Sequence, residues 1–149
     1  MLLTGFSAVL ASLLYFFASA IIWKKIQSPS SQQDIRSKII KIVAIAVALH
    51  LYALSATLWV DANIYFDIGN GVSLVLVLAS LILLITLLNK PTEALGIFIY
   101  PLAALSTLAP HAIEQKIQLP LELGSHVLIS VAAYSIMGIA TAQAILYGV

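Results

Sequence analysis

Long apolar stretches alternate with short polar segments along the whole chain. Five of these stretches approach or exceed the length of a membrane span, and they cover residues 2–23, 39–60, 72–89, 95–109 and 124–149. A transmembrane helix needs about 20 such residues because each one advances about 1.5 Å along the axis. The pattern therefore predicts an all-α fold, a polytopic membrane bundle of five transmembrane helices forming one domain over residues 1–149.

The polar segments predict the orientation of this bundle. Five of the seven cationic residues lie in or beside the first polar segment: Lys24, Lys25, Arg36, Lys38 and Lys41. Loops rich in lysine and arginine stay on the cytoplasmic side of a membrane. We expect residues 24–38 to form a cytoplasmic loop, residues 61–71 and 110–123 to lie outside, and the N-terminus to be outside as well.

Composition agrees with this assignment and excludes several classes of site. The chain is 62% hydrophobic and 9% charged, whereas a soluble domain carries roughly 25% charged residues. Because there is no cysteine, the chain itself has no disulfide, thiolate-bound zinc, iron–sulfur cluster or covalent c-type haem. Its net charge of +1, without a basic cluster that includes aromatic residues, gives no sign of a nucleic-acid partner.

His50 lies near the centre of the second apolar stretch. An imidazole at that depth is costly unless it faces the protein interior and has a partner. On a helix, Leu54, Thr57 and Asp61 share its face, which leads to the outer surface about 15 Å away. Two interpretations remain open: His50 ligates a metal or haem, or it is a buried histidine bonded to a nearby hydroxyl or carbonyl.

The other two histidines lie near the outer surface in this topology. His126 is in the first turn of the fifth span, and Glu122, four residues earlier, is placed to hydrogen-bond it. The same helical face continues through Ser130, Ala133 and Met137. This narrow face would admit another helix or a flat ligand. His111 follows Pro110 in the second outer loop, and for both histidines the alternative is a solvated surface residue.

Three histidines in a helical bundle suit haem, whose iron often takes imidazole ligands. We therefore take His50, His126 and His111 as candidate haem-binding residues, with His50 and His126 as candidate iron ligands. His50 and His126 would share one iron only if their helices were offset. Otherwise the candidate ligands form two sites at different levels of the membrane, a deep site at His50 and a shallow site at His126 and His111.

The third stretch carries a face of polar or small residues, Asn70, Ser73, Val77 and Ser80, which we expect to pack inward. His50 should face this stripe and the fifth helix. Pro101 interrupts the fourth stretch and is expected to kink it.

No catalytic pattern is present, since the chain lacks a nucleophile–base pair, a phosphate loop, an HExxH motif and paired carboxylates inside the spans. We expect no enzymatic activity. Asp61 and Asp67 are expected to be solvated loop acids.

Four segments carry a resemblance to a known family: residues 48–54 around His50, residues 66–74, the Tyr100–Pro101 pair and residues 126–135 beginning at His126. In order and spacing they resemble the cytochrome c assembly protein family, the membrane haem-handling group that includes the CcsA and HemX-like proteins. The YpjD-type inner-membrane branch is the most similar. The resemblance covers essentially the whole chain.

The resemblance implies a bacterial inner-membrane protein that binds or handles haem in cytochrome c-type biogenesis. It implies His50 and His126 as the main ligands and His111 as a weaker candidate. Family members usually have about eight membrane helices, so the chain would correspond to the first five. Haem-delivering members also carry a tryptophan-rich outer segment, whereas Trp23 and Trp59 here are better explained as interfacial anchors.

Two other functions remain alternatives. The chain could be a cofactor-free helical subunit that regulates or stabilises another membrane complex, or a transporter with His50 as a proton-linked site. The transporter is the weakest, because the spans contain no paired carboxylates and no inverted repeat. A Soret band that disappears in His50→Ala would favour haem, and a colourless protein with a fixed partner would favour the subunit.

The predicted orientation can be tested by labelling, with no background because the chain has no cysteine. A membrane-impermeant thiol reagent added from outside should modify Asn63→Cys and spare Ser30→Cys. The reverse pattern would contradict the orientation.

Overall fold

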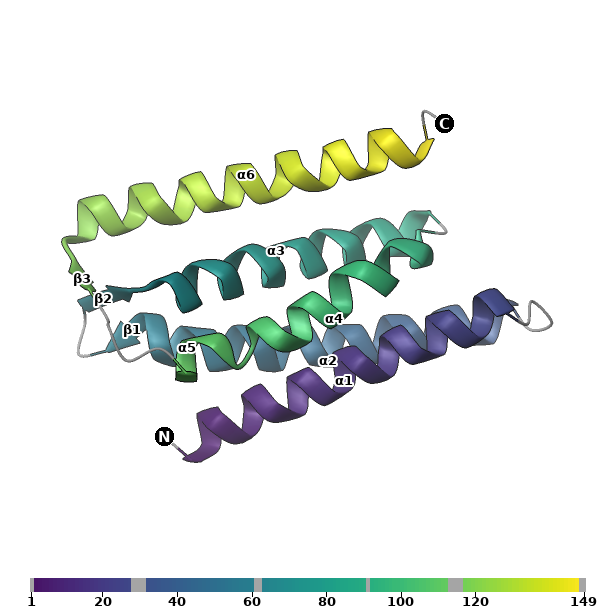
Figure 1. Ribbon diagram of the computed structural model, residues 1–149, viewed down its shortest axis with the longest axis horizontal. Coiled ribbons are helices and arrows are strands. Elements are labelled where there is room, and N and C mark those ends of the chain that lie inside the picture. The colour runs from purple at the N-terminus through teal and green to yellow at the C-terminus, as the bar shows by residue number, and fades with distance from the viewer. Residues whose placement is uncertain (1, 28–31, 61–62, 91, 113–116, 148–149) are drawn as a thin grey trace.

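The computed structural model describes residues 2–27, 32–60, 63–90, 92–112 and 117–147. Its long helices are α1 (Leu2–Gln27), α2 (Gln32–Leu58), α3 (Ile68–Asn89), α4 (Gly96–Ser106) and α6 (Leu121–Tyr147). In the described part of the chain, five helical segments are long and apolar enough to cross a membrane. The predicted all-α, multi-pass membrane architecture is therefore confirmed (Figure 1).

Four of the long helices extend at one or both ends beyond the apolar stretches that predicted them, whereas α4 (Gly96–Ser106) is shorter than the predicted 95–109 and ends before the separate short helix α5 (Ala109–Ala112). α1 continues through Lys24 and Lys25, and α2 begins at Gln32 instead of residue 39. Most of the expected 24–38 loop is therefore helical, and residues 28–31 lie outside the described residues. Glutamine, lysine and arginine are good helix formers, and cations in a last turn interact favourably with the helix dipole. The polar residues show where the apolar region of the sequence ends. The helix α1 continues past that point, and α2 begins before the next apolar stretch.

A small sheet was missed by the prediction. Its strands are β1 (Trp59–Val60), β2 (Asn63–Phe66) and β3 (Ile117–Leu119), in the order β1-β2-β3 and antiparallel throughout. β2 joins both partners, with Ile64 opposite Trp59 and also opposite Leu119. The two segments expected to be outer loops therefore pair with each other. We call this end of the bundle the strand end.

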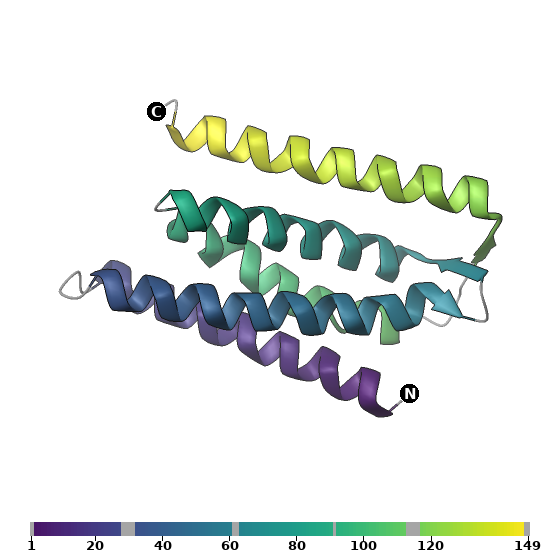
Figure 2. The ribbon, with the colours of Figure 1, turned by 180° about the vertical axis from the view of Figure 1, so that it is seen from behind.

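The helices pack as a four-helix group with one helix beside it. α1 packs on α2 and α4, α2 packs on α3, and α3 packs on α4. The short helix α5 (Ala109–Ala112) covers the strand end of α3. By contrast α6 packs on α3 and on β2, so it lies along one side of the group, as both views show (Figures 1 and 2).

Two glycines allow close approach of these helices. A Cβ atom on Gly69 would lie 2.7 Å from the carbonyl oxygen of Ala109, so glycine lets α3 begin against α5. A Cβ atom on Gly96 would lie 2.8 Å from a methyl carbon of Ile22, where α4 meets α1. The helix α4 continues through Pro101.

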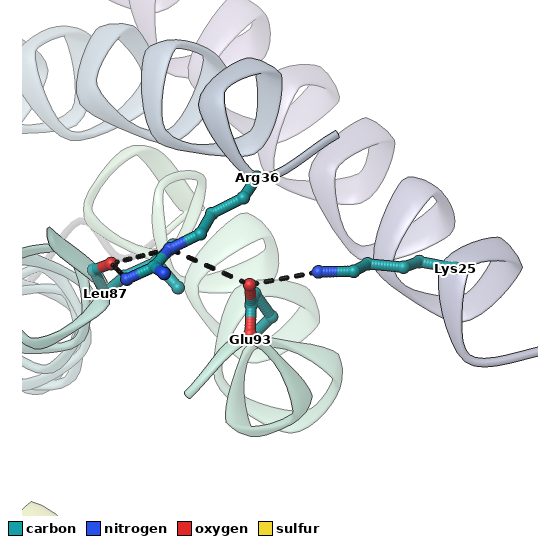
Figure 3. A network of polar contacts seen from close by, with 4 residues as sticks. All are labelled: Lys25, Arg36, Leu87 and Glu93. Carbon is teal, nitrogen blue, oxygen red and sulfur yellow. Dashed lines mark hydrogen bonds and ion pairs between the residues drawn. The ribbon is translucent and has the colours of Figure 1, made fainter. Parts of the chain in front are cut away.

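A charged cluster joins four elements at the opposite end, which we call the basic end (Figure 3). The Nζ atom of Lys25 on α1 lies 3.0 Å from Oε1 of Glu93 in the short 3-10 helix η1 (Glu93–Leu95). Arg36 on α2 lies with its Nε atom 3.9 Å from the same oxygen. Arg36 also donates from Nε and Nη2 to the carbonyl oxygen of Leu87, at 3.2 and 2.6 Å.

This cluster stabilises the basic end in two ways. The Glu93 side chain is only 10% exposed, and two cations compensate its burial. The guanidinium of Arg36 satisfies a carbonyl in the last turn of α3, where helix carbonyls have no partner within the helix. The cluster therefore sets the relative positions of α1, α2, α3 and η1.

We expect Glu93→Gln to lower the free energy of unfolding by about 1–3 kcal/mol, because the amide cannot pair with Lys25 as a carboxylate does. Thermal unfolding in detergent micelles measures the change. Glu122→Gln is the matched control, since Glu122 is exposed on α6. Equal effects of the two substitutions would contradict a stabilising role for the cluster.

Candidate functional site

His50 is fully buried in the interior of the four-helix group, at 0% exposure. Leu54 and Thr57, on the same face of α2, are buried too. The predicted inward orientation of this face is therefore confirmed, and the fourth residue of the face, Asp61, lies outside the described residues. By contrast Leu51, the next residue of α2, is 40% exposed on the outer surface.

Both ring nitrogens of His50 have a hydroxyl partner. The Nε2 atom lies 2.8 Å from Oγ of Ser73 on α3, and the Nδ1 atom lies 3.4 Å from the Oη atom of Tyr15 on α1. The Tyr15 ring also meets the imidazole edge to face, with centroids 5.8 Å apart and planes at 80°. A neutral imidazole offers one donor and one acceptor, and a hydroxyl can complement either. His50 therefore joins three helices through hydrogen bonds, as the second interpretation of this residue expected.

One hydrogen-bond partner of His50 lies on the helix that the sequence predicted, and the other lies on a different helix. All four members of the expected stripe on α3 are buried: Asn70, Ser73, Val77 and Ser80. The second partner, however, comes from α1 and not from the last helix, because α6 packs outside the four-helix group. Tyr15 in turn stacks on Tyr100 of α4, with centroids 5.9 Å apart. All four helices of the group therefore meet around this centre.

A second polar cluster closes the strand end. Asp67 is the N-cap of α3, and its Oδ1 atom accepts from the backbone N–H of Asn70 at 2.7 Å. The Asn70 side chain donates to the carbonyl oxygen of Tyr65 at 3.1 Å and accepts from the Thr57 hydroxyl at 2.9 Å. Asp67 is only 7% exposed. Its expected role as a solvated loop acid is therefore wrong, because capping draws the carboxylate into the packed helix start.

His126 and His111 have a different environment from His50. Both are exposed, His126 on α6 and His111 on α5. Within the described part of the chain, no hydrogen bond or ion pair joins Glu122 to His126. The face that continues from His126 is open, since Ala133 is exposed and Met137 is 59% exposed.

The histidines do not assemble into one centre. Among the described residues, no group of three or more His, Cys, Asp or Glu side chains could hold a metal ion. His50 lies eight residues before the end of α2, and His126 lies five residues after the start of α6. These positions are about 12 and 8 Å from the helix ends. The depths differ, and one ring is enclosed while the other is exposed, which favours the two-level arrangement over a shared iron.

The sequence analysis did not identify Tyr15 and Glu93 as members of these clusters, although the sequence contains an indication of each. Tyr15 is a hydroxyl-bearing residue near the middle of an apolar span, and a buried tyrosine usually finds a hydrogen-bond partner. Glu93 is an acidic residue in the turn that faces the most basic part of the chain. Neither indication identifies the residue that Tyr15 or Glu93 would contact, because those residues lie on other helices.

Comparison of the chain with protein-family models, with curated proteins and with solved structures finds no match in any of the three.

We expect His50→Ala to lower the free energy of unfolding by about 2–4 kcal/mol, because it leaves a cavity and removes the partner of two hydroxyls. Combining it with Ser73→Ala in a double-mutant cycle should give a coupling energy of about 0.5–1.5 kcal/mol, as for other polar pairs inside membrane proteins. Leu51→Ala is the control. A cost as large for Leu51→Ala as for His50→Ala, together with zero coupling, would contradict a structural role for His50.

Proposed function

We propose that this membrane protein binds haem in connection with cytochrome c assembly, and that His126 would hold the iron. The observation that carries the proposal is the exposed imidazole of His126 near the start of α6, on a face that remains open. The resemblance of residues 48–54, 66–74 and 126–135 to the cytochrome c assembly family supports the same function. On this proposal the protein lies in a bacterial inner membrane, with its basic end in the cytoplasm.

His126 fits the requirements of a haem ligand better than the other candidates. An axial ligand needs a ring nitrogen that points into space large enough for a flat, mostly apolar macrocycle. Beyond His126 the face of α6 offers Ala133 and Met137, both exposed, with small or flexible side chains. These side chains would contact the macrocycle if haem binds at this face.

His50 is less suited than His126 to ligate haem iron. Its ring is fully enclosed, and its two nitrogens contact Ser73 and Tyr15. Iron ligation would require the 2.8 Å contact to Ser73 to break and the surrounding helices to separate. We therefore propose that His50 holds α1, α2 and α3 together, and that His111, which is exposed on α5, is the second candidate ligand.

The proposal covers haem binding and not delivery to an apocytochrome. When bound, haem would supply an iron centre for electron transfer or for hand-over to another protein. Trp23 and Trp59 are 56% and 54% exposed near the basic end and the strand end, as expected for interfacial anchors. Neither forms part of a tryptophan-rich surface beside His126.

A cofactor-free interaction subunit remains the second candidate function. One specific observation favours it: α6 packs on α3 and β2, and large side chains such as Ile129 and Tyr134 are exposed on it. A partner helix docked on this face would use the same open surface that haem would use. An absorption spectrum separates the two functions.

We expect purified protein titrated with hemin in detergent to show a saturable Soret band. His126→Ala should weaken hemin binding more than about tenfold or shift the band, since it removes a ligand. His50→Ala should leave the band in place while lowering thermal stability. His111→Ala tests the second candidate ligand.

The same titration can overturn the proposal. Non-saturable binding that is identical in wild type and His126→Ala would exclude a specific site at His126. Loss of the band in folded His50→Ala but not in His126→Ala would make His50 the ligand instead.

A further inference from the structure

An apolar cleft lies between α1 and α4 near the basic end. It has a volume of about 700 Å³, and its walls include Phe16, Phe17, Ile21, Trp23, Lys24 and Ile97. Phe17 and Trp23 are 57% and 56% exposed, so the cleft opens onto the outer surface of the bundle. In a membrane that surface faces lipid.

The sequence explains why the cleft forms at this place. Ser19 and Ala20, which also line the cleft, have small side chains and leave room between the neighbouring aromatic rings. Gly96 lets α4 approach α1 closely at Ile22, so the two helices meet beside the cleft. The cleft therefore belongs to the packing of α1 on α4.

The two lysines in the last turn of α1 have different roles. Lys25 is bound to Glu93 at 3.0 Å and belongs to the charged cluster. Lys24 lines the cleft and makes no hydrogen bond or ion pair with any other described residue. Its neighbour Trp23 is of the type that settles at the headgroup level of a bilayer. The cleft thus combines an apolar wall at acyl-chain depth with a cation at headgroup depth.

We propose that this cleft binds one acidic phospholipid, with an acyl chain along Phe16, Phe17 and Ile97 and the phosphate beside Lys24. Each lysine near a membrane surface favours anionic lipid, and Lys24 supplies that charge beside the space that an acyl chain would fill. A second copy of this chain is a poorer occupant, because a two-fold contact would place the same patch, with its Lys24, on both sides of the interface. The site is independent of the haem proposal, since it lies on α1 and α4.

Quenching of Trp23 fluorescence by brominated lipids tests the proposal. The single-tryptophan variant Trp59→Phe would be reconstituted into phosphatidylcholine vesicles containing either brominated phosphatidylglycerol or brominated phosphatidylcholine at the same fraction. We expect stronger quenching by the anionic lipid. Adding Lys24→Gln should reduce that preference about fivefold, as expected for the loss of one interfacial charge. Lys90→Gln is the control, because Lys90 is exposed at the same end but does not line the cleft.

Three outcomes would overturn the proposal. Equal quenching by the two lipids would exclude selectivity for an acidic headgroup. An equal loss of preference in Lys24→Gln and Lys90→Gln would show attraction to the whole charged surface instead of to the cleft. Trp23 that neither lipid quenches, in a protein that migrates as a dimer, would make a second copy the occupant.

Discussion

A polar group inside a bilayer needs its hydrogen-bond partner within the protein, because hydrocarbon offers none and an unsatisfied group costs several kcal/mol. His50 is a fully buried polar group of this kind near the middle of the second span. Ser73 and Tyr15 contact it from two other helices, and the stacking of Tyr15 on Tyr100 extends the contact to a fourth. Because these side chains must face one another, their contacts determine how each of the four helices is rotated about its own axis.

The two ends of the four-helix group follow the same constraint. At the strand end, Asn70 links the start of α3 to Thr57 on α2. At the basic end, Glu93 and Arg36 link η1 to α1, α2 and the last turn of α3. Polar contacts at three depths thus hold α1 to α4 in one arrangement. The outer helix α6 lies beyond these three clusters, which leaves His126 and its face available for a ligand or a partner.

The features of the fold that depend on the local pattern of apolar and polar residues could be predicted from the sequence. Hydropathy identified the five spans that the described part of the chain contains, and helical spacing placed Ser73 and His50 on inward faces. The local pattern did not identify Tyr15 as the second partner, because a contact between two different helices leaves no trace in the sequence pattern of either helix alone. The strands around Ile64 were missed because each is short and because β3 pairs with β2 from a remote part of the chain. Asp67 was misjudged because its burial depends on the packing of α3 against its neighbours.

Two histidines thus have different proposed roles: His50 holds the bundle together, and His126 binds haem. Nitrogen NMR of protein labelled with ¹⁵N-histidine, with and without haem, tests this difference most directly. The ring resonances of His50 are expected to keep their positions when haem is added, while those of His126 shift strongly or broaden beyond detection. Resonances of His50 that shift while those of His126 remain in place would contradict the account.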